Sequence, residues 1–229
     1  MATPDFPFAS EIPFLFMQTL IAVANGVTIT SSMVSMSYLY KMYWGQADRK
    51  PLFASIAIGG VTLAVTVLQF VSPRVVPALQ RDAAALAAGE WWRVVTPLFV
   101  QPYGVIQGLF NGLFLLVFLP ICERLFGRGV WAIYFGAGIV GQLVNYAWSR
   151  GGGGSSTAAF GLMGALLVYL LRNRNEVPRG YLFLATLGIC GAVTMCFIRD
   201  GHGPGLLAGA LAASILKLPA KHELSGMKS

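Results

Sequence analysis

Charge is scarce in this chain. Only 11% of its 229 residues are Asp, Glu, Lys or Arg, whereas 56% are hydrophobic. Soluble domains carry about 25% charged residues, so the composition excludes an ordinary soluble domain. Histidine and cysteine are also rare, with 2 and 3 residues. The cysteines (Cys122, Cys190 and Cys196) lie in apolar runs without Cys-x-x-Cys spacing, which predicts buried free thiols and no metal site.

Seven uncharged apolar segments separate the charged residues. A helix of about 20 apolar residues spans a bilayer, so the pattern predicts an all-α fold, a polytopic membrane helix bundle. Residues 72–104 are amphipathic and rich in aromatic residues, and we expect them to lie at the membrane interface without crossing it. Gly151–Ser156 has the composition of a linker. The seven segments are residues 12–40, 52–71, 105–122, 130–148, 157–171, 180–198 and 203–216.

The basic residues predict the orientation of the bundle. If the N-terminus lies outside, 11 Lys and Arg residues fall in inside segments and 5 fall in outside segments. Cytoplasmic loops are the ones enriched in basic residues, so we expect the N-terminus outside and the C-terminus in the cytoplasm. The net charge of +7 then reflects membrane orientation, and no nucleic-acid partner is expected.

Few polar groups occur within the segments, and intramembrane polar groups often mark function. Ser156 and His202 begin the fifth and seventh segments, and Gln107 and Asn111 share one face of the third. At about 1.5 Å per residue, Ser156, His202 and Gln107 each lie roughly 22–24 Å from the inner end of their segment. Residues from three separate segments are therefore expected at the same depth, just below the outer membrane surface.

Small residues predict which segments pack together. A small residue at every fourth position lets helix backbones approach closely in a membrane. If two such stripes face each other, Ser156 and His202 meet at their upper end. The stripes are Gly201, Gly205, Gly209 and Ala213 in the seventh segment, and Thr157, Gly161 and Ala165 in the fifth.

Such a meeting favours acyl-transfer chemistry. A serine hydroxyl becomes a nucleophile when a base such as histidine takes its proton. Asn111, Gln107 and the backbone N–H of Ser156 are candidate oxyanion donors, and Phe160, one turn below Ser156, can pack against the imidazole. We expect no Asp or Glu at this depth in the neighbouring helices, so the pair would be a dyad.

Each signal also has a simpler explanation. Ser155 or Ser156 can be a helix N-cap, and His202 can be an interfacial side chain at a helix end. Gln107 and Asn111 can bond across helices instead of serving an oxyanion. Only the joint placement favours the catalytic interpretation.

Five motifs together resemble the rhomboid intramembrane serine proteases, over about residues 52–216. His202–Gly209 resembles the His-x-x-Gly-x-x-x-Gly helix of that family, and Ser156–Ala165 resembles its nucleophile helix. Gln107–Asn111 is similar to the His-x-x-x-Asn motif, with Gln107 in place of the histidine. The other two are residues 90–99, similar to the Trp-Arg segment of the first loop, and Leu119–Gly127, similar to the Leu-Glu-x-x-x-Gly helix end.

The resemblance implies a six-helix rhomboid-like core over residues 51–218. Residues 1–50 would add an N-terminal tail, an extra transmembrane helix and a loop, and residues 219–229 a cytoplasmic tail. The implied activity is that of a serine endopeptidase that cleaves transmembrane protein substrates near the outer face of a lipid bilayer, in a bacterial plasma membrane. No cofactor is implied, and the oligomeric state stays open.

The resemblance also implies the roles of the site residues. Ser156 would be the nucleophile, His202 the general base, and Asn111 with Gln107 the oxyanion donors. Two other classes compete. A rhomboid-like protein with little or no activity could bind transmembrane helices, although such relatives commonly lack the serine or histidine that this chain has. A small transporter would be expected to have inverted repeats, which the sequence does not show.

Overall fold

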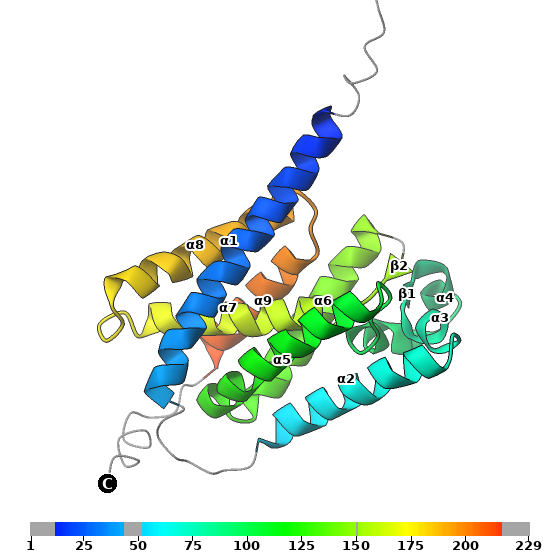
Figure 1. Ribbon diagram of the computed structural model, residues 1–229, viewed down its shortest axis with the longest axis horizontal. Helices are drawn as coiled ribbons and strands as arrows, with labels where there is room; N and C mark the ends of the chain where they lie inside the picture. Colours follow the sequence, from blue (N-terminus) through cyan, green and yellow to red (C-terminus); the bar gives the residue numbers. More distant parts are fainter. Residues whose placement is uncertain (1–11, 44–51, 150, 217–229) are drawn as a thin grey trace, which may run out of the picture.

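The protein is all-α, as the sequence predicts. The computed structural model describes residues 12–43, 52–149 and 151–216, with side chains from residue 15 to 42 in the first range. A long helix covers each predicted segment (Figure 1). The seven helices are α1 (Ile12–Tyr43), α2 (Phe53–Val71), α5 (Val105–Phe126), α6 (Gly129–Trp148), α7 (Ser156–Arg172), α8 (Arg179–Phe197) and α9 (His202–Ile215).

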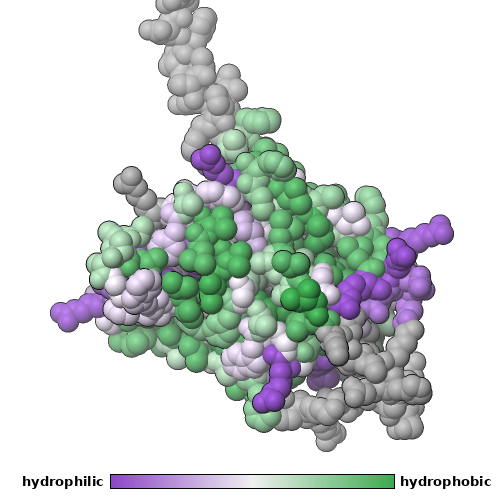
Figure 2. Space-filling view, turned by 180° about the vertical axis from the view of Figure 1, so that it is seen from behind, coloured by the Kyte–Doolittle hydropathy of each residue, from purple (hydrophilic) through white to green (hydrophobic). Residues whose placement is uncertain are grey.

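Helix lengths and surface composition fit a membrane protein. Five helices (α1, α2, α5, α6 and α8) are long and apolar enough to cross a bilayer. Figure 2 shows hydrophobic side chains over much of the visible face, with strongly hydrophilic residues gathered at its edges. Helix α7 has only 17 residues, but most of its side chains are buried among the other helices. It is therefore the centre of the bundle.

Glycines set the distance between α7 and α9, the two helices in most extensive contact. Gly209 lies against the backbone of Gly161, and Gly205 lies against the carbonyl group of Thr157. Gly161 also faces Ala137 of α6. A side chain at Gly205 or Gly209 would collide with backbone atoms of α7, so these positions admit only glycine at the present spacing.

Helix α1, the additional N-terminal helix, packs mainly on α8. Thr28 of α1 lies against Gly191 of α8, and Ser31 lies against Gly188. Part of the polar half of the first segment is thus buried, namely Thr28, Ser31, Ser32 and Ser35, whereas Thr30 and Ser37 are exposed. Helix α8 also contacts α7 and α9. Cys122 on α5 is buried, but on α8 Cys190 is exposed and Cys196 is partly exposed. The expectation of three buried thiols is wrong for these two.

The segment between α2 and α5 (residues 72–104), called here the first loop, folds into short elements at one end of the bundle, without crossing it (Figure 1). Its strand β1 pairs antiparallel with β2 in the glycine run, with Arg81 opposite Gly152 and Asp82 opposite Gly151. The interpretation of the glycine run as a linker is therefore wrong. The short elements are α3 (Val75–Leu79), β1 (Arg81–Asp82), α4 (Ala83–Ala87), η1 (Trp91–Val94), η2 (Thr96–Leu98) and β2 (Gly151–Gly152).

Two charged residues, Glu123 and Arg93, hold the start of α2 and the segment that follows α2. Glu123 of α5 accepts hydrogen bonds from the backbone N–H groups of Ala54 and Ser55, at 2.8 and 2.7 Å, and so caps the N-terminus of α2. Arg93 is buried and donates to the carbonyl oxygens of Pro77 and Gln80, at 2.9 and 2.7 Å. The arginine of the Trp-Arg segment therefore anchors the loop.

The orientation stays a prediction. Several of the basic residues on which it depends lie outside the described residues: Arg49, Lys50, Arg150, Lys217, Lys221 and Lys228.

The contact between α7 and α9 predicts opposite effects for two glycine substitutions. Gly209→Ala puts a methyl group into the backbone of Gly161, and we expect it to lower the free energy of unfolding by about 1–3 kcal/mol. Gly136→Ala, on an exposed position of α6 with open space around it, should raise it by about 0.5–1 kcal/mol. Thermal unfolding in detergent measures both, and equal midpoints for the two variants would contradict the close approach.

Candidate active site

Ser156 and His202 meet where α7 and α9 begin. Oγ of Ser156 lies 3.0 Å from Nε2 of His202, close enough for the hydroxyl to donate a hydrogen bond to the ring. Ser156 is the first residue of α7 and His202 the first residue of α9. Because the glycine contacts align the two helices, residues 46 positions apart form one pair. The arrangement can deprotonate a serine hydroxyl as it attacks a carbonyl carbon.

The two neighbouring serines differ in their surroundings. Ser155 is fully buried, and its side chain makes no capping hydrogen bond to α7. Its Oγ accepts instead from Nε2 of Gln101 at 3.3 Å. Ser156 is partly exposed and faces His202. The geometry therefore favours Ser156 over Ser155 as the reactive hydroxyl.

Phe160 packs against the imidazole. The ring centroids of Phe160 and His202 lie 4.6 Å apart, with 33° between the ring planes. Phe160 is buried one turn below Ser156 on α7. It limits the tilt of the imidazole from the side that faces the core.

The side-chain amides of Gln107 and Asn111 converge on Gly154. A methyl group added to Gly154 would lie 2.5 Å from Nε2 of Gln107, 3.3 Å from Nδ2 of Asn111 and 3.4 Å from Oγ of Ser156. Each amide nitrogen carries two hydrogens. One from Gln107 bonds the carbonyl oxygen of Gly153 at 2.9 Å. The space beside Gly154 is therefore where an oxyanion formed at Ser156 could receive hydrogen bonds.

Gln101 and Gln69, which no sequence pattern singled out, support the candidate oxyanion donor Asn111. Buried Gln101 accepts from Nδ2 of Asn111 at 2.6 Å through its Oε1. Gln69 of α2 clamps the backbone of Gln101, accepting from its N–H at 2.8 Å and donating to its carbonyl oxygen at 3.0 Å. Glutamine in or beside an apolar helix was the only signal in the sequence. Its partner lies 32 residues away, so the pattern alone gave no reason to join the two.

A second polar cluster fixes the glycine run. Arg81 is buried, bonding the side-chain carbonyl of Gln142 and, at 2.6 Å, the backbone oxygen of Gly151. Gln142 also donates to Oγ1 of Thr157 at 3.3 Å. Gly141 leaves room for the branched side chain of Thr157, since a methyl group there would lie 2.9 Å from its Cβ. The glycine run before Ser156 is thus held in place from α6 and from the first loop.

A carboxylate lies beside His202, contrary to expectation. Oδ1 of Asp200 is 2.6 Å from Nδ1 of His202, so the site is not a bare Ser-His pair. Asp200 belongs to the connection between α8 and α9, whereas the sequence analysis searched the neighbouring helices for a carboxylate at the depth of His202. Burial raises the pKa of Asp200, but the hydrogen bonds and charge of His202 lower it to about 2. The carboxylate is therefore ionised at neutral pH.

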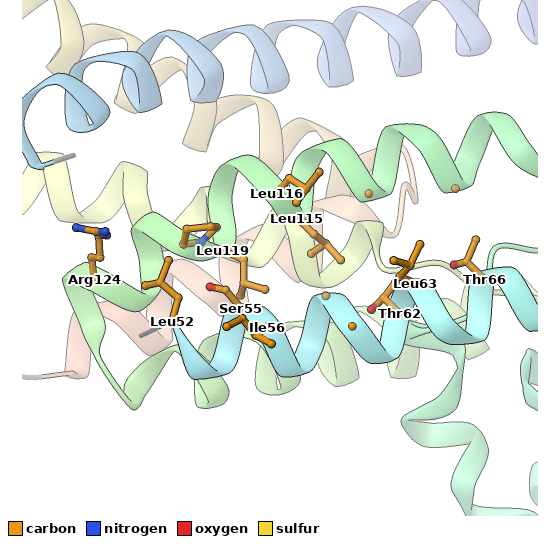
Figure 3. A pocket seen from close by; sticks show the side chains of 15 residues that line it. Leu52, Ser55, Ile56, Thr62, Leu63, Thr66, Leu115, Leu116, Leu119 and Arg124 are labelled. Atoms are coloured by element: carbon orange, nitrogen blue, oxygen red, sulfur yellow. The ribbon is translucent and has the colours of Figure 1, made fainter. Parts of the chain in front are cut away.

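An apolar groove lies elsewhere, between α2 and α5 (Figure 3). It has a volume of about 650 Å³, and its lining includes four glycines, Gly59, Gly60, Gly108 and Gly112. Neither Ser156 nor His202 lines it. Among the described residues there is also no group of three or more His, Cys, Asp or Glu side chains that could hold a metal.

Comparison with known proteins gives one family model and two relatives. A family model described as "Rhomboid domain" matches residues 88–218. The chain is 35% identical over 147 residues to the rhomboid protease GluP of Bacillus subtilis (strain 168), an alignment covering 61% of this chain and 29% of that protein. It is 31% identical over 135 residues to the putative rhomboid protease YdcA of the same organism, covering 55% of this chain and 67% of that protein.

The alignments leave part of each protein unmatched. The chain spans less than a third of the first relative's length and two thirds of the second's. Within this chain, the matched region 88–218 contains Ser156, His202 and Asp200, and it excludes α1 and α2.

The space beside Gly154 predicts how Ser156 reacts with a fluorophosphonate, a probe that phosphonylates activated serines. Asn111→Ala removes one donor, and we expect labelling to slow by about 10²- to 10³-fold. Gly154→Ala fills the same space and should also slow it. The matched control is Gly112→Ala, next to Asn111 on α5 but facing open space, which should label at the wild-type rate. Wild-type labelling of Asn111→Ala would contradict the assignment of the oxyanion donors.

Proposed function

The chain belongs to the rhomboid family, and we propose that it is an intramembrane serine endopeptidase in which Ser156 is the nucleophile and His202 the general base. The observation that carries the proposal is the 3.0 Å approach of Ser156 Oγ to His202 Nε2. Two relatives named as rhomboid proteases support it. The protein is an integral membrane protein, as its apolar helices and its family indicate.

The proposed reaction proceeds in two steps. Oγ of Ser156 bonds to the scissile carbonyl carbon while its proton moves to Nε2 of His202. The carbonyl oxygen becomes an oxyanion and accepts from Asn111, Gln107 and the backbone N–H of Ser156. The C–N bond then breaks, and Nε2 gives its proton to the leaving amine. Water hydrolyses the acyl-enzyme by the same path in reverse.

The proposed substrates are transmembrane proteins cut near the outer face of the bilayer. Ser156 begins α7 directly after the glycine run, whose strand β2 pairs with β1 of the first loop, and His202 lies beside Ser156. The pair therefore lies at the same end of the bundle as the first loop, where Figure 1 labels β1, α3 and α4. The excess of basic residues in the inside segments favours an N-terminus outside, a C-terminus in the cytoplasm, and hence this end outside. A helical substrate must expose a peptide bond to Ser156, so helix-breaking residues near the cut should favour cleavage. A bacterial plasma membrane is the proposed location.

The proposed domain organisation extends the family match, residues 88–218, to include α2. Residues 51–218 form the six-helix core, from α2 to α9. Residues 1–50, which include α1, and the tail 219–229 are additions to it. The family match alone, over residues 88–218, leaves α1 without a role.

Labelling with a fluorophosphonate probe tests the proposal. We expect the purified protein to be labelled, and the labelling to disappear in Ser156→Ala, which lacks the nucleophile, and in His202→Ala, which lacks the base. The wild type should also cleave a transmembrane peptide in lipid vesicles, and Ser156→Ala should not. Loss of any one member of such a set removes nearly all of its effect.

A variant at Gln107 completes the test. Gln107→His restores the residue of the family motif, and we expect activity equal to or above the wild type. If folded wild type and Gln107→His are both unlabelled and cleave nothing, the peptidase proposal is wrong. The helix-binding alternative would then be the one to pursue, by capture of the transmembrane peptide in vesicles.

A further inference from the structure

Asp200 is held in one position by its backbone. Helix α8 ends at Phe197, and Arg199, two residues later, has a φ of 58°, in the left-handed region. This turn lets the backbone N–H of Asp200 bond the carbonyl oxygen of Met195 at 2.8 Å. Gly201, the next residue, lies against the side chain of Asn145 on α6. The turn therefore places the carboxylate of Asp200 directly beside His202.

The two carboxylate oxygens of Asp200 have different partners. Oδ1 lies 2.6 Å from Nδ1 of His202 and accepts from the backbone N–H of the same residue at 3.0 Å. Oδ2 accepts from Nδ2 of Asn25, on α1, at 2.6 Å. The other N–H of that amide bonds the carbonyl oxygen of Ile21 at 3.0 Å. Asn25 is thus oriented by its own helix and directed at Asp200.

Helix capping does not account for this arrangement. The N-cap of α9 is Gly201, and one oxygen of Asp200 is enough to satisfy the first free backbone N–H of the helix, that of His202. The contact with Nδ1 and the contact with Asn25, from a helix 175 residues away in sequence, are additional. The side chain of Asp200 is only 10% exposed. Burying a carboxylate costs free energy unless the charge is paired and hydrogen-bonded, and the contacts with His202 and Asn25 supply this.

We propose that Asp200 is a positioning residue that completes a Ser156–His202–Asp200 triad, and that Asn25 of α1 holds its carboxylate. The inference rests on the proposed peptidase function. With Nδ1–H donated to Asp200, the lone pair of His202 lies on Nε2 and faces the hydroxyl of Ser156. When Nε2 takes the proton of Ser156, the imidazolium that forms is stabilised by the adjacent carboxylate. Asp200 takes no proton in the reaction.

The proposal gives α1 a role. This helix lies outside the matched region 88–218, yet it supplies Asn25. The contacts of Thr28 with Gly191, and of Ser31 with Gly188, fix the position of α1 along the axis of α8. They thereby fix Asn25 against Asp200, so the additional helix takes part in ordering the site.

Two substitutions at Asp200 separate positioning from capping. Serine and asparagine cap helices about as well as aspartate, but Asp200→Ser cannot reach Nδ1, and Asp200→Asn carries no charge. We expect kcat for cleavage of a transmembrane peptide in vesicles to fall by about 10²- to 10⁴-fold in both. KM and the thermal midpoint should change little. A folded Asp200→Ser or Asp200→Asn protein with wild-type kcat would overturn the proposal.

Asn25 offers a second arm with a control on the same helix. Asn25→Ala should lower kcat about tenfold, the effect of losing one hydrogen bond to a charged group. The control is Ser37→Ala, an exposed residue of α1 whose hydroxyl bonds only the carbonyl oxygen of Val34. It should keep wild-type kcat. Equal kcat in Asn25→Ala and Ser37→Ala would remove Asn25 from the proposal.

A spectroscopic readout makes the inference independent of turnover. The chain has 2 histidines, His202 and His222, so ¹⁵N labelling of the imidazoles gives a simple spectrum that His222→Gln assigns. We expect the neutral ring of His202 to carry its proton on Nδ1 in the wild type and to lose this preference in Asp200→Ser. An unchanged tautomer in Asp200→Ser would refute the positioning role. The expected tautomer change in a protein that cleaves nothing would refute the peptidase function and leave the positioning role standing.

Discussion

The close approach of α7 and α9 is the constraint on which the rest of the structure depends. Gly205 and Gly209 lie against backbone atoms of Thr157 and Gly161, so the distance between the two helix axes is limited by the backbones themselves. In a membrane, helices are held by packing and interhelical hydrogen bonds, because lipid is as apolar as a leucine side chain. A stripe of glycines therefore does more than stabilise the pair. It fixes the height of one helix against the other, and with it the 3.0 Å contact at their N-termini.

The polar groups of the site satisfy one another in pairs that cross from one element to the next. Gln69 bonds the backbone of Gln101, whose side chain in turn bonds Asn111 and Ser155. Such chains of buried hydrogen bonds are strong only when every member is paired. The amides are consequently rigid, and the groups around Gly154 need little rearrangement to receive a negative charge.

The first loop belongs to the site although it carries none of its reactive groups. The β1–β2 pairing and the bond from the N–H of Gly154 to the carbonyl oxygen of Pro97, at 2.7 Å, hold the glycine run. Gly152 and Gly154 have φ values of 115° and 138°, which only glycine adopts without strain. Arg93 and Arg81 are buried and donate hydrogen bonds to backbone carbonyl oxygens of the first loop and the glycine run. These bonds hold the backbone at this end of the bundle in one conformation. From the additional helix α1, Nδ2 of Asn25 donates a hydrogen bond to Asp200.

The sequence by itself determined the seven helices. A single apolar segment in lipid can satisfy its backbone hydrogen bonds within itself only by forming a helix. It also predicted that Ser156, His202, Gln107 and Asn111 lie near one another, since counting residues along each segment gave them similar depths. The tertiary structure alone decided the rest. Asp200 follows a left-handed turn, Asn25 comes from a helix far away in sequence, and Gln101 lies in a loop. None of these has a period that predicts its partner, because hydrogen bonds between distant elements depend on how the helices are rotated and how their connections turn. Helix formation is local and repeats along the chain, whereas the surroundings of His202 depend on the packing of α1, α8 and α9.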